Sequence, residues 1–576
     1  MRSCVRWIVV GTSLVTIGWN GSSAQSVEIA QKLVPVVPPE RPITLPTPTP
    51  QPSSSPDLLN PEVPAIPSPV LELAPSEGTV FVKAFRFEGN TVFTAEQLEV
   101  VTAPYANRKL TFTELLQARS AVTDFYVRAG YVTSGAYLPV EMNQFLDPDA
   151  AVFTIRVIEG KVEAIDIVGD RRLSRYVRSR LKQATEPVLN RFQLEEALRL
   201  LQIDPLIESV SANLSTGSQA NLSVLTVQVK QVPPLNAQVQ LNNGRSPTVG
   251  TLERGVQISA VNLLGQGDSF SVNYRNTDGT NGVDTDFTIP LSARNGTVSF
   301  RYSNLQSRIV ESPFDQLDIQ GSSRIYELSV RQPMIQRVHE TYVEEFALGL
   351  TASRLESETT LLGIPFPLSA GADSEGKTRI TALRFFQEYR RRSEKSVFIA
   401  RSQLSFGLDA LGSTINEASP DSRFLVWRGQ MAWFQRVLGD SRLLVRTDLQ
   451  LADRPLVPLE QFSLGGPSTV RGYRQDAIIS ENGFFSTVEL QIPLLNTNRL
   501  RLDIVPFVDV GTTWNSGKSL NPDPRTLAST GLGLQFQHGG LLVRINYAIP
   551  FVDLDSERRS LQEQGFDFVL RYYWRF

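Results

Sequence analysis

The sequence predicts a mainly β protein: a sixteen-stranded transmembrane antiparallel β-barrel preceded by two β-α-α-β-β modules. Residues 234–576 contain sixteen short segments in which polar and apolar side chains alternate, as they do in strands. Long and short connections between these segments also alternate, which is typical of barrels in bacterial outer membranes. Residues 79–231 contain the same order of strands and helices twice, which indicates a repeated module.

Residues 1–24 have the features of a secretory signal peptide. Arg2 and Arg6 precede a mostly apolar stretch, and small residues end at Ala24, after which we expect cleavage. The only cysteine, Cys4, lies in this segment, so the mature chain is predicted to contain no disulfide. The formal net charge of −3 gives no basic surface of the kind that nucleic acid binding requires.

The rest of the chain divides into four parts. Residues 25–78 are rich in proline and are predicted to form an extended linker, with room for a short N-terminal helix only at 26–34. We expect a first module at 79–160, a second at 161–233 and the barrel at 234–576.

The first module is predicted because apolar residues recur at strand spacing in some segments and at helix spacing in others. Strands are expected at 80–87, 132–138 and 152–158, and helices at 94–101 and 111–129.

The second module repeats this order. Strands are expected at 162–168, 207–214 and 222–229, with helices at 173–184 and 191–201.

The barrel strands follow without any helical period. They are predicted near 236–243, 254–262, 268–276, 284–291, 297–305, 322–333, 341–353, 377–390, 396–408, 422–436, 441–452, 484–495, 500–511, 529–537, 541–548 and 566–576. An even number of strands puts both barrel ends on the rim with the short connections, and that rim is expected to face the periplasm, where the two modules would lie. Charged faces such as the one with Glu489 and Asp509 would be costly against lipid, so they are expected to face a wet lumen.

Two motifs in the barrel resemble those of a known family. Val470, Arg471, Gly472 and Tyr473 match the VRGY loop tip, and residues 507–511 match the F-x-D-x-G strand motif, of BamA-like outer-membrane barrels. Within that superfamily the chain resembles the two-partner-secretion transporters of the hemolysin and hemagglutinin exporter type, whose polypeptide-transport-associated (POTRA) domains the two modules resemble. The resemblance covers roughly residues 79 to 576.

This resemblance implies that the long loop folds inward and that Arg471 pairs with Asp509. The pair would hold the loop at one depth in the pore. A guanidinium offers paired donors to a carboxylate, and Gly472 and Gly511 belong to the two motifs. Glu489 is expected to be a second acceptor, because strand alternation puts it on the lumen side. The alternative is a solvated loop arginine and a structural lumen acid, since exposed ion pairs contribute little.

The modules suggest how an extended client would be captured. A client could add as a strand to a sheet edge beside a helix, using backbone hydrogen bonds. The alternative is that the modules only brace the barrel. The candidate cargo-binding residues are Phe125, Val132, Thr133, Ser134 and Leu138 in the first module, and Ile207 and Val210 in the second.

The chain ends in a strand of alternating aromatic residues. Trp574 and Phe576 resemble the targeting signal that the barrel-assembly machinery reads, although an interfacial aromatic girdle would look similar.

The sequence contains few residues that could form a catalytic or metal site. Its only histidines, His339 and His538, are far apart and have no cysteine partners, so we expect no enzyme activity, no metal and no cofactor. The resemblance implies secretion of an unfolded, β-helical partner protein through a pore in the outer-membrane lipids. The alternatives are a BamA-like insertase and, less favoured because of the modules, a passive porin.

Overall fold

The structure is a computed structural model of the 576-residue chain. It describes residues 8–10, 13–15, 59–61, 79–139, 151–219, 221–339, 341–497, 499–517, 519–554 and 559–576. The predicted cleavage site after Ala24 and the helix predicted at 26–34 lie outside these residues. Within the predicted signal peptide, β1 (Ile8–Val10) and β2 (Ser13–Val15) pair with each other.

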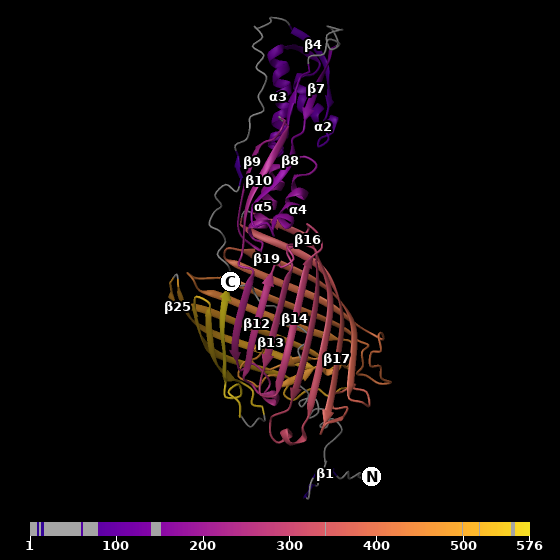
Figure 1. The fold of residues 1–576 in the computed structure, drawn as a ribbon, viewed down its shortest axis with the longest axis vertical. Coiled ribbons are helices and arrows are strands. Elements are labelled where there is room, and N and C mark those ends of the chain that lie inside the picture. Colours follow the sequence, from indigo (N-terminus) through magenta and orange to yellow (C-terminus); the bar gives the residue numbers. More distant parts are fainter. Residues whose placement is uncertain are drawn as a thin grey trace.

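The C-terminal part is a closed antiparallel barrel, drawn from magenta to yellow in Figure 1. Its sixteen spanning strands are β11 (Leu235–Asn242), β12 (Glu253–Val261), β13 (Ser269–Asn276), β14 (Thr280–Pro290), β15 (Thr297–Arg308), β16 (Gln320–Val338), β17 (Tyr342–Leu361), β19 (Lys377–Ser393), β20 (Ser396–Leu408), β21 (Leu425–Arg436), β22 (Arg442–Ala452), β25 (Asn482–Asn496), β26 (Leu500–Trp514), β27 (Thr526–His538), β28 (Leu541–Pro550) and β29 (Phe566–Arg575). The two-residue β18 (Ile364–Pro365) extends the end of β17. The predicted strand count and order are confirmed.

The two faces of each barrel strand differ in exposure. On β26, Val508 and Val510 are exposed, whereas the alternating Asp503 and Asp509 are fully buried. The apolar outward face and polar inward face are those of a barrel with lipid outside and water inside. Closure follows from pairing of the last strand with the first, as in Leu570 of β29 opposite Leu241 of β11.

Connection lengths agree with the prediction at most positions. The connection between β13 and β14 is an exception: it has only residues 277–279, because β14 begins at Thr280 and not at residue 284 as predicted. The Thr277 amide donates to the Thr280 carbonyl at 2.9 Å, which closes this turn and extends the strand pair beyond the predicted length.

The first module has a four-stranded sheet in the order β5-β4-β7-β6. Its elements are β4 (Thr79–Glu88), α2 (Ala95–Thr102), the 3-10 turn η1 (Ala103–Tyr105), β5 (Arg108–Thr111), α3 (Phe112–Arg128), β6 (Gly135–Tyr137) and β7 (Ala151–Ile158). Capping boxes, Thr94 with Gln97 and Thr111 with Glu114, start the two helices. The sequence prediction missed β5, which is short and polar.

The strand predicted at 132–138 is shorter in the structure. Only β6 (Gly135–Tyr137) is a strand, because the Ser134 amide donates to the Tyr131 carbonyl in a turn after α3.

The second module repeats the predicted order and lies between the first module and the barrel (Figure 1). Its elements are β8 (Lys161–Gly169), α4 (Ser174–Thr185), α5 (Arg191–Gln202), β9 (Ile207–Thr216) and β10 (Leu222–Gln231). The sheet order is β3-β9-β10-β8, where β3 (Leu59–Pro61) comes from the proline-rich segment. In the described part of the chain, no helix combines the length and the apolar character needed to cross a membrane.

The second module sits on the rim with the short connections. Arg180 of α4 donates two hydrogen bonds, of 3.0 and 2.7 Å, to Asn295 Oδ1 in the turn between β14 and β15. A Cβ on Gly267, between β12 and β13, would lie 2.2 Å from the Tyr176 ring, so glycine allows that turn to approach α4 closely. These contacts place the short turns and the modules on the same side of the barrel.

Candidate functional site

The long loop, residues 453–481 between β22 and β25, folds into the barrel. It contains the 3-10 turn η5 (Pro458–Glu460) and a small hairpin of β23 (Phe462–Leu464) and β24 (Ile478–Ser480). Near its tip Val470 is fully buried and Arg471 is 4% exposed. The loop therefore occupies part of the lumen.

Arg471 is bound to two acidic residues of the barrel wall. Its Nε donates to Asp509 Oδ2 at 2.7 Å and its Nη2 to Asp509 Oδ1 at 2.7 Å, which is the paired geometry expected for arginine and a carboxylate. Its Nη1 donates to Glu489 Oε1 at 2.8 Å. The structure thus brings together the three residues predicted from the motif and from strand parity; we call them the loop lock.

Neighbouring wall residues surround the loop lock. Thr487 accepts a hydrogen bond from Arg471 Nη2 at 3.0 Å, and the Phe507 ring centroid lies 3.5 Å from the guanidinium carbon. Arg544 of β28 places Nη2 3.0 Å from Glu489 Oε1. Strand parity alone puts Thr487 and Phe507 on the lumen face, but nothing in the sequence pairs β28 with this site.

The other residues of the loop tip contact the strands that follow. Gly472 has a φ of +88°, which favours glycine, and its backbone lies against Ala548 and Pro550. The Tyr473 hydroxyl donates to the Ala528 carbonyl at 2.9 Å and accepts from the Val552 amide at 3.1 Å. The tip is therefore held by backbone contacts as well as by charge.

Gly511, the last residue of the strand motif, has a packing role. A Cβ at this position would lie 2.3 Å from Leu464 Cδ1, in the small hairpin of the long loop. Glycine on the wall thus lets β23 approach β26 closely.

The base of the long loop has a second buried ion pair. Arg384 of β19 donates to Glu460 through Nη2 at 2.6 Å and Nη1 at 3.1 Å, and both residues are at most 5% exposed. Next to it is an apolar cluster in which loop residues pack against the wall. Its members are Leu305, Ile325, Leu355, Ile380, Ala382, Phe424, Val426, Leu456, Val457 and Leu459. This second pair was missed because Glu460 belongs to no recognised motif.

Most of the candidate cargo-binding side chains lie inside their modules. Thr133 and Ser134 of the first module and Ile207 and Val210 of the second are at most 8% exposed. Phe125 and Leu138 are partly buried against the first core, and Val132 is half-buried. Any client would therefore meet backbone edges rather than these side chains.

The two edges differ in availability. Within the described part of the first module β6 pairs with β7 alone, and its Ala136 amide donates to Thr123 Oγ1 of α3 at 3.0 Å. In the second module β3 pairs with Ala212–Leu214 of β9, so this part of the edge predicted at Ile207–Leu214 is occupied. This corrects the expectation for residues 212–214.

The C-terminal aromatic residues lie on the outward face. Trp574 is 40% and Phe576 68% exposed, and the Phe576 amide donates to the Leu235 carbonyl at 2.9 Å, at the seam where the barrel closes.

Comparison with known sequences gives two matches to family models. Residues 221–536 match the haemolysin secretion/activation protein family ShlB/FhaC/HecB, and residues 80–160 match the ShlB-type POTRA domain. Among curated relatives, the outer membrane transporter CdiB of Escherichia coli is 25% identical over 514 residues, covering 83% of this chain and 80% of the relative. The heme/hemopexin transporter protein HuxB of Haemophilus influenzae strain 86-028NP is 18% identical over 498 residues, covering 80% and 81%.

Solved structures show the same fold. CdiB from Escherichia coli superposes with a TM-score of 0.65 at 19% identity and covers 96% of this chain and 95% of its own. BamA from Haemophilus ducreyi, lacking POTRA domains 1–3, gives a TM-score of 0.51 at 15% identity and covers 86% and 100%.

Proposed function

Because the chain belongs to the haemolysin secretion/activation protein family ShlB/FhaC/HecB, we propose that it captures an unfolded partner protein in the periplasm and secretes it through the barrel pore. The chain is an outer-membrane translocator with periplasmic N-terminal modules. Capture of the cargo, its unfolded state and the role of each site residue are the proposal. BamA resembles this chain in fold alone, so an insertase role has no separate support here.

The loop lock carries this proposal. A loop that crosses part of the lumen must be held at one depth in the resting state and must move for a polypeptide to pass. Removing Arg471 would leave Asp509 and Glu489 as buried acids with fewer partners, so the loop would lose its resting position. We expect secretion to require this position.

The experiment is co-expression of the chain with a candidate exoprotein, chosen as a large secreted protein from among the genes next to its own. Arg471→Ala is expected to abolish secretion while insertion into the outer membrane persists, as judged by heat-modifiable gel mobility. The matched control is Arg454→Ala, because Arg454 lies in the same loop but is exposed and forms its ion pair with the adjacent Asp453. Full secretion by Arg471→Ala would remove the loop lock from the mechanism.

Cargo capture is assigned to the outer side of β6 in the first module. This strand is at the sheet edge, beside α3, and its outward Ala136 amide is held by a side chain rather than by another strand. A client strand would have to displace Thr123 to pair with it. Backbone pairing would explain how one edge accepts varied sequences.

Two substitutions separate capture from bracing. Ala136→Pro removes the amide that a client needs, whereas Thr123→Val frees the amide from its side-chain cap. Binding of the exoprotein's N-terminal segment to the full chain is expected to fall in the first variant and to persist or strengthen in the second. Equal binding by both variants and the unmodified chain would reduce the first module to a spacer.

A further inference from the structure

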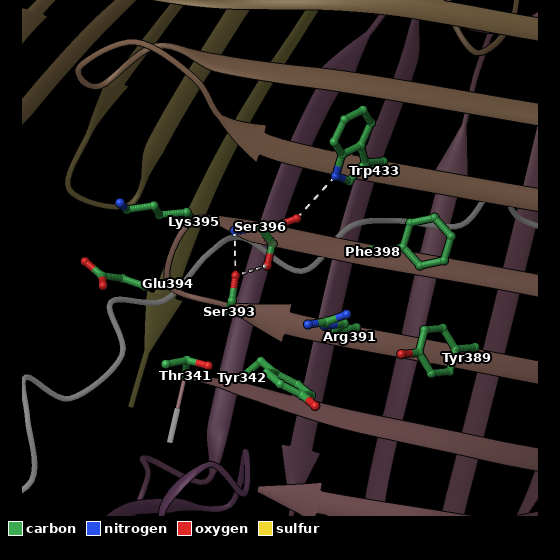
Figure 2. Close-up of a pocket in the computed structure, with 10 residues that line it drawn as sticks. All are labelled: Thr341, Tyr342, Tyr389, Arg391, Ser393, Glu394, Lys395, Ser396, Phe398 and Trp433. Atoms are coloured by element: carbon green, nitrogen blue, oxygen red, sulfur yellow. Dashed lines mark hydrogen bonds between the residues drawn. The ribbon is translucent and has the colours of Figure 1, made fainter. Parts of the chain in front are cut away.

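A pocket of about 780 Å³ opens at the periplasmic rim, where β19 turns into β20. Figure 2 shows its lining, which combines four aromatic rings with charged and polar side chains. The rings belong to Tyr342, Tyr389, Phe398 and Trp433, and the positive charges to Arg391 and Lys395. We call it the rim pocket.

Strand alternation puts the rim pocket on the outward face of the barrel. On β19, Leu383 is exposed while Ala382 and Arg384 are buried inside, and Tyr389 and Arg391 share the parity of Leu383. Phe398 on β20 lies directly opposite Arg391 on one side and Trp433 of β21 on the other, so all these side chains share the outward face.

The rim pocket lies at the depth of the lipid headgroups. The turn with Glu394 and Lys395 is on the rim that carries the second module, and that rim faces the periplasm. Further along the same strands the outward side chains are the aromatic residues of the pocket, and beyond them the surface is apolar, as at Leu383 and Leu350. Aromatic belts of this kind mark the boundary between hydrocarbon and headgroups.

Arg391 gives the rim pocket its chemistry. Its guanidinium carbon lies 4.1 Å from the Tyr342 ring centroid, and His339 stacks on the same ring at 4.2 Å. Stacking orients the guanidinium and leaves its N–H donors for another acceptor.

The carboxylate nearest to Arg391 along the sheet is engaged elsewhere. Glu344 of β17 lies opposite Arg391, but its Oε1 is 3.9 Å from Arg337 Nη1 and 3.4 Å from His339 Nε2. Among the described residues no carboxylate is within ion-pair distance of Arg391, so its guanidinium is available to an acceptor at headgroup depth.

The net charge around the rim pocket selects the acceptor. Among the described residues that line it, Arg391 and Lys395 are positive and Glu394 is negative, which leaves one positive charge. An acceptor at headgroup depth that carries one negative charge, and an apolar part to lie against the rings, is an anionic glycerophospholipid.

We propose that the rim pocket binds one anionic glycerophospholipid of the periplasmic leaflet, with its phosphate on Arg391. The glycerol backbone and the first part of the acyl chains lie against Tyr342, Tyr389, Phe398 and Trp433. Occupation of this site fixes the depth of the rim next to the modules.

The test is native mass spectrometry of the purified full chain in detergent, titrated with phosphatidylglycerol or with phosphatidylcholine of the same acyl chains. The first phosphatidylglycerol is expected to bind more tightly than phosphatidylcholine. Arg391→Gln is expected to weaken it about fivefold, the effect of roughly 1 kcal/mol per basic residue at a membrane surface. Arg391→Lys keeps the charge but loses the stacked planar group. Its affinity for phosphatidylglycerol is expected to lie between those of the unmodified chain and Arg391→Gln.

The control is Arg499→Gln, which removes a positive charge from an exposed position in another turn of the same rim, between β25 and β26. It is expected to leave the first binding step unchanged. Unchanged phosphatidylglycerol binding by Arg391→Gln, equal binding of the two lipids, or an equal loss in Arg499→Gln would overturn the proposal. Heat-modifiable mobility of each variant shows that its barrel has folded.

Discussion

Arg384 on β19 and Glu460 in the long loop form a paired ion contact on a different part of the wall from Arg471 and Asp509. In the barrel, β20, β21, β22 and β25 separate β19 from the strand that carries Asp509. The base and the tip of one loop are therefore bound separately, and each contact can be broken without touching the other.

Breaking the contact at the base should loosen the loop there. Glu460→Gln removes the charge that Glu460 offers Arg384, at an expected cost of about 1–2 kcal/mol once water in the lumen is allowed for, and roughly tenfold more frequent opening. The measurement is maleimide labelling of Leu456→Cys, a 1% exposed position in a mature chain predicted to lack thiols. An unchanged labelling rate would show that the apolar cluster alone holds the base.

Close packing at Gly511 should be sensitive to a single methyl group. Gly511→Ala is expected to destabilise the resting loop by about 1–3 kcal/mol, because a Cβ would overlap Leu464. Leu464→Ala in the same chain should relieve the overlap. Labelling of Ile478→Cys, a 7% exposed position in the same hairpin as Leu464, in both single variants and the double variant measures the coupling; strictly additive effects would mean that the two residues do not interact.

Arg180 should hold the second module at a fixed angle to the barrel. Arg180→Ala removes both hydrogen bonds to Asn295, and the distribution of distances between spin labels on α4 and on the turn at Asn295 is expected to broaden. Arg178→Ala is the control, since Arg178 donates within its own module, to the Ile165 carbonyl. A distribution as narrow as that of the unmodified chain would assign the angle to other contacts.

Stability of the first module should depend on pH through Glu159. Burial alone would raise the pKa of Glu159, but hydrogen bonds from Thr91, the Val92 amide and Tyr126 hold this pKa below its usual value. A lowered pKa gives stability that is present above the unfolded-state value of about 4.3 and is lost as pH falls through the folded-state value.

Glu159→Gln should therefore lower the hydrogen-exchange protection of the Thr91 and Val92 amides at pH 7, and flatten its dependence on pH in the acid range. Glu163→Gln is the control, because Glu163 accepts from an exposed turn amide at Ser218 in the second module. Equal protection in the Glu159 variant and the unmodified chain would contradict this role of Glu159.

The sixteen barrel strands were predictable from the amino-acid order, because alternation and connection length are local properties that a wet lumen and a lipid exterior impose on each strand separately. Parity also put Asp509 and Glu489 in the lumen, and the resemblance added Arg471 as their partner. Short elements were less predictable: β5 has a single buried residue, Leu110, and therefore little hydrophobic signal.

Which distant residues meet became apparent only in the folded chain. Arg544, Arg384 and Glu460 reach their partners because the barrel closes and the loop folds inward, and neither event leaves a periodic pattern in the sequence. The availability of the module edges depends in the same way on Thr123 beside β6 and on residues 59–61 beside β9. Whether a strand edge is paired depends on where other segments of the chain run. Alternation within one strand carries no information about that.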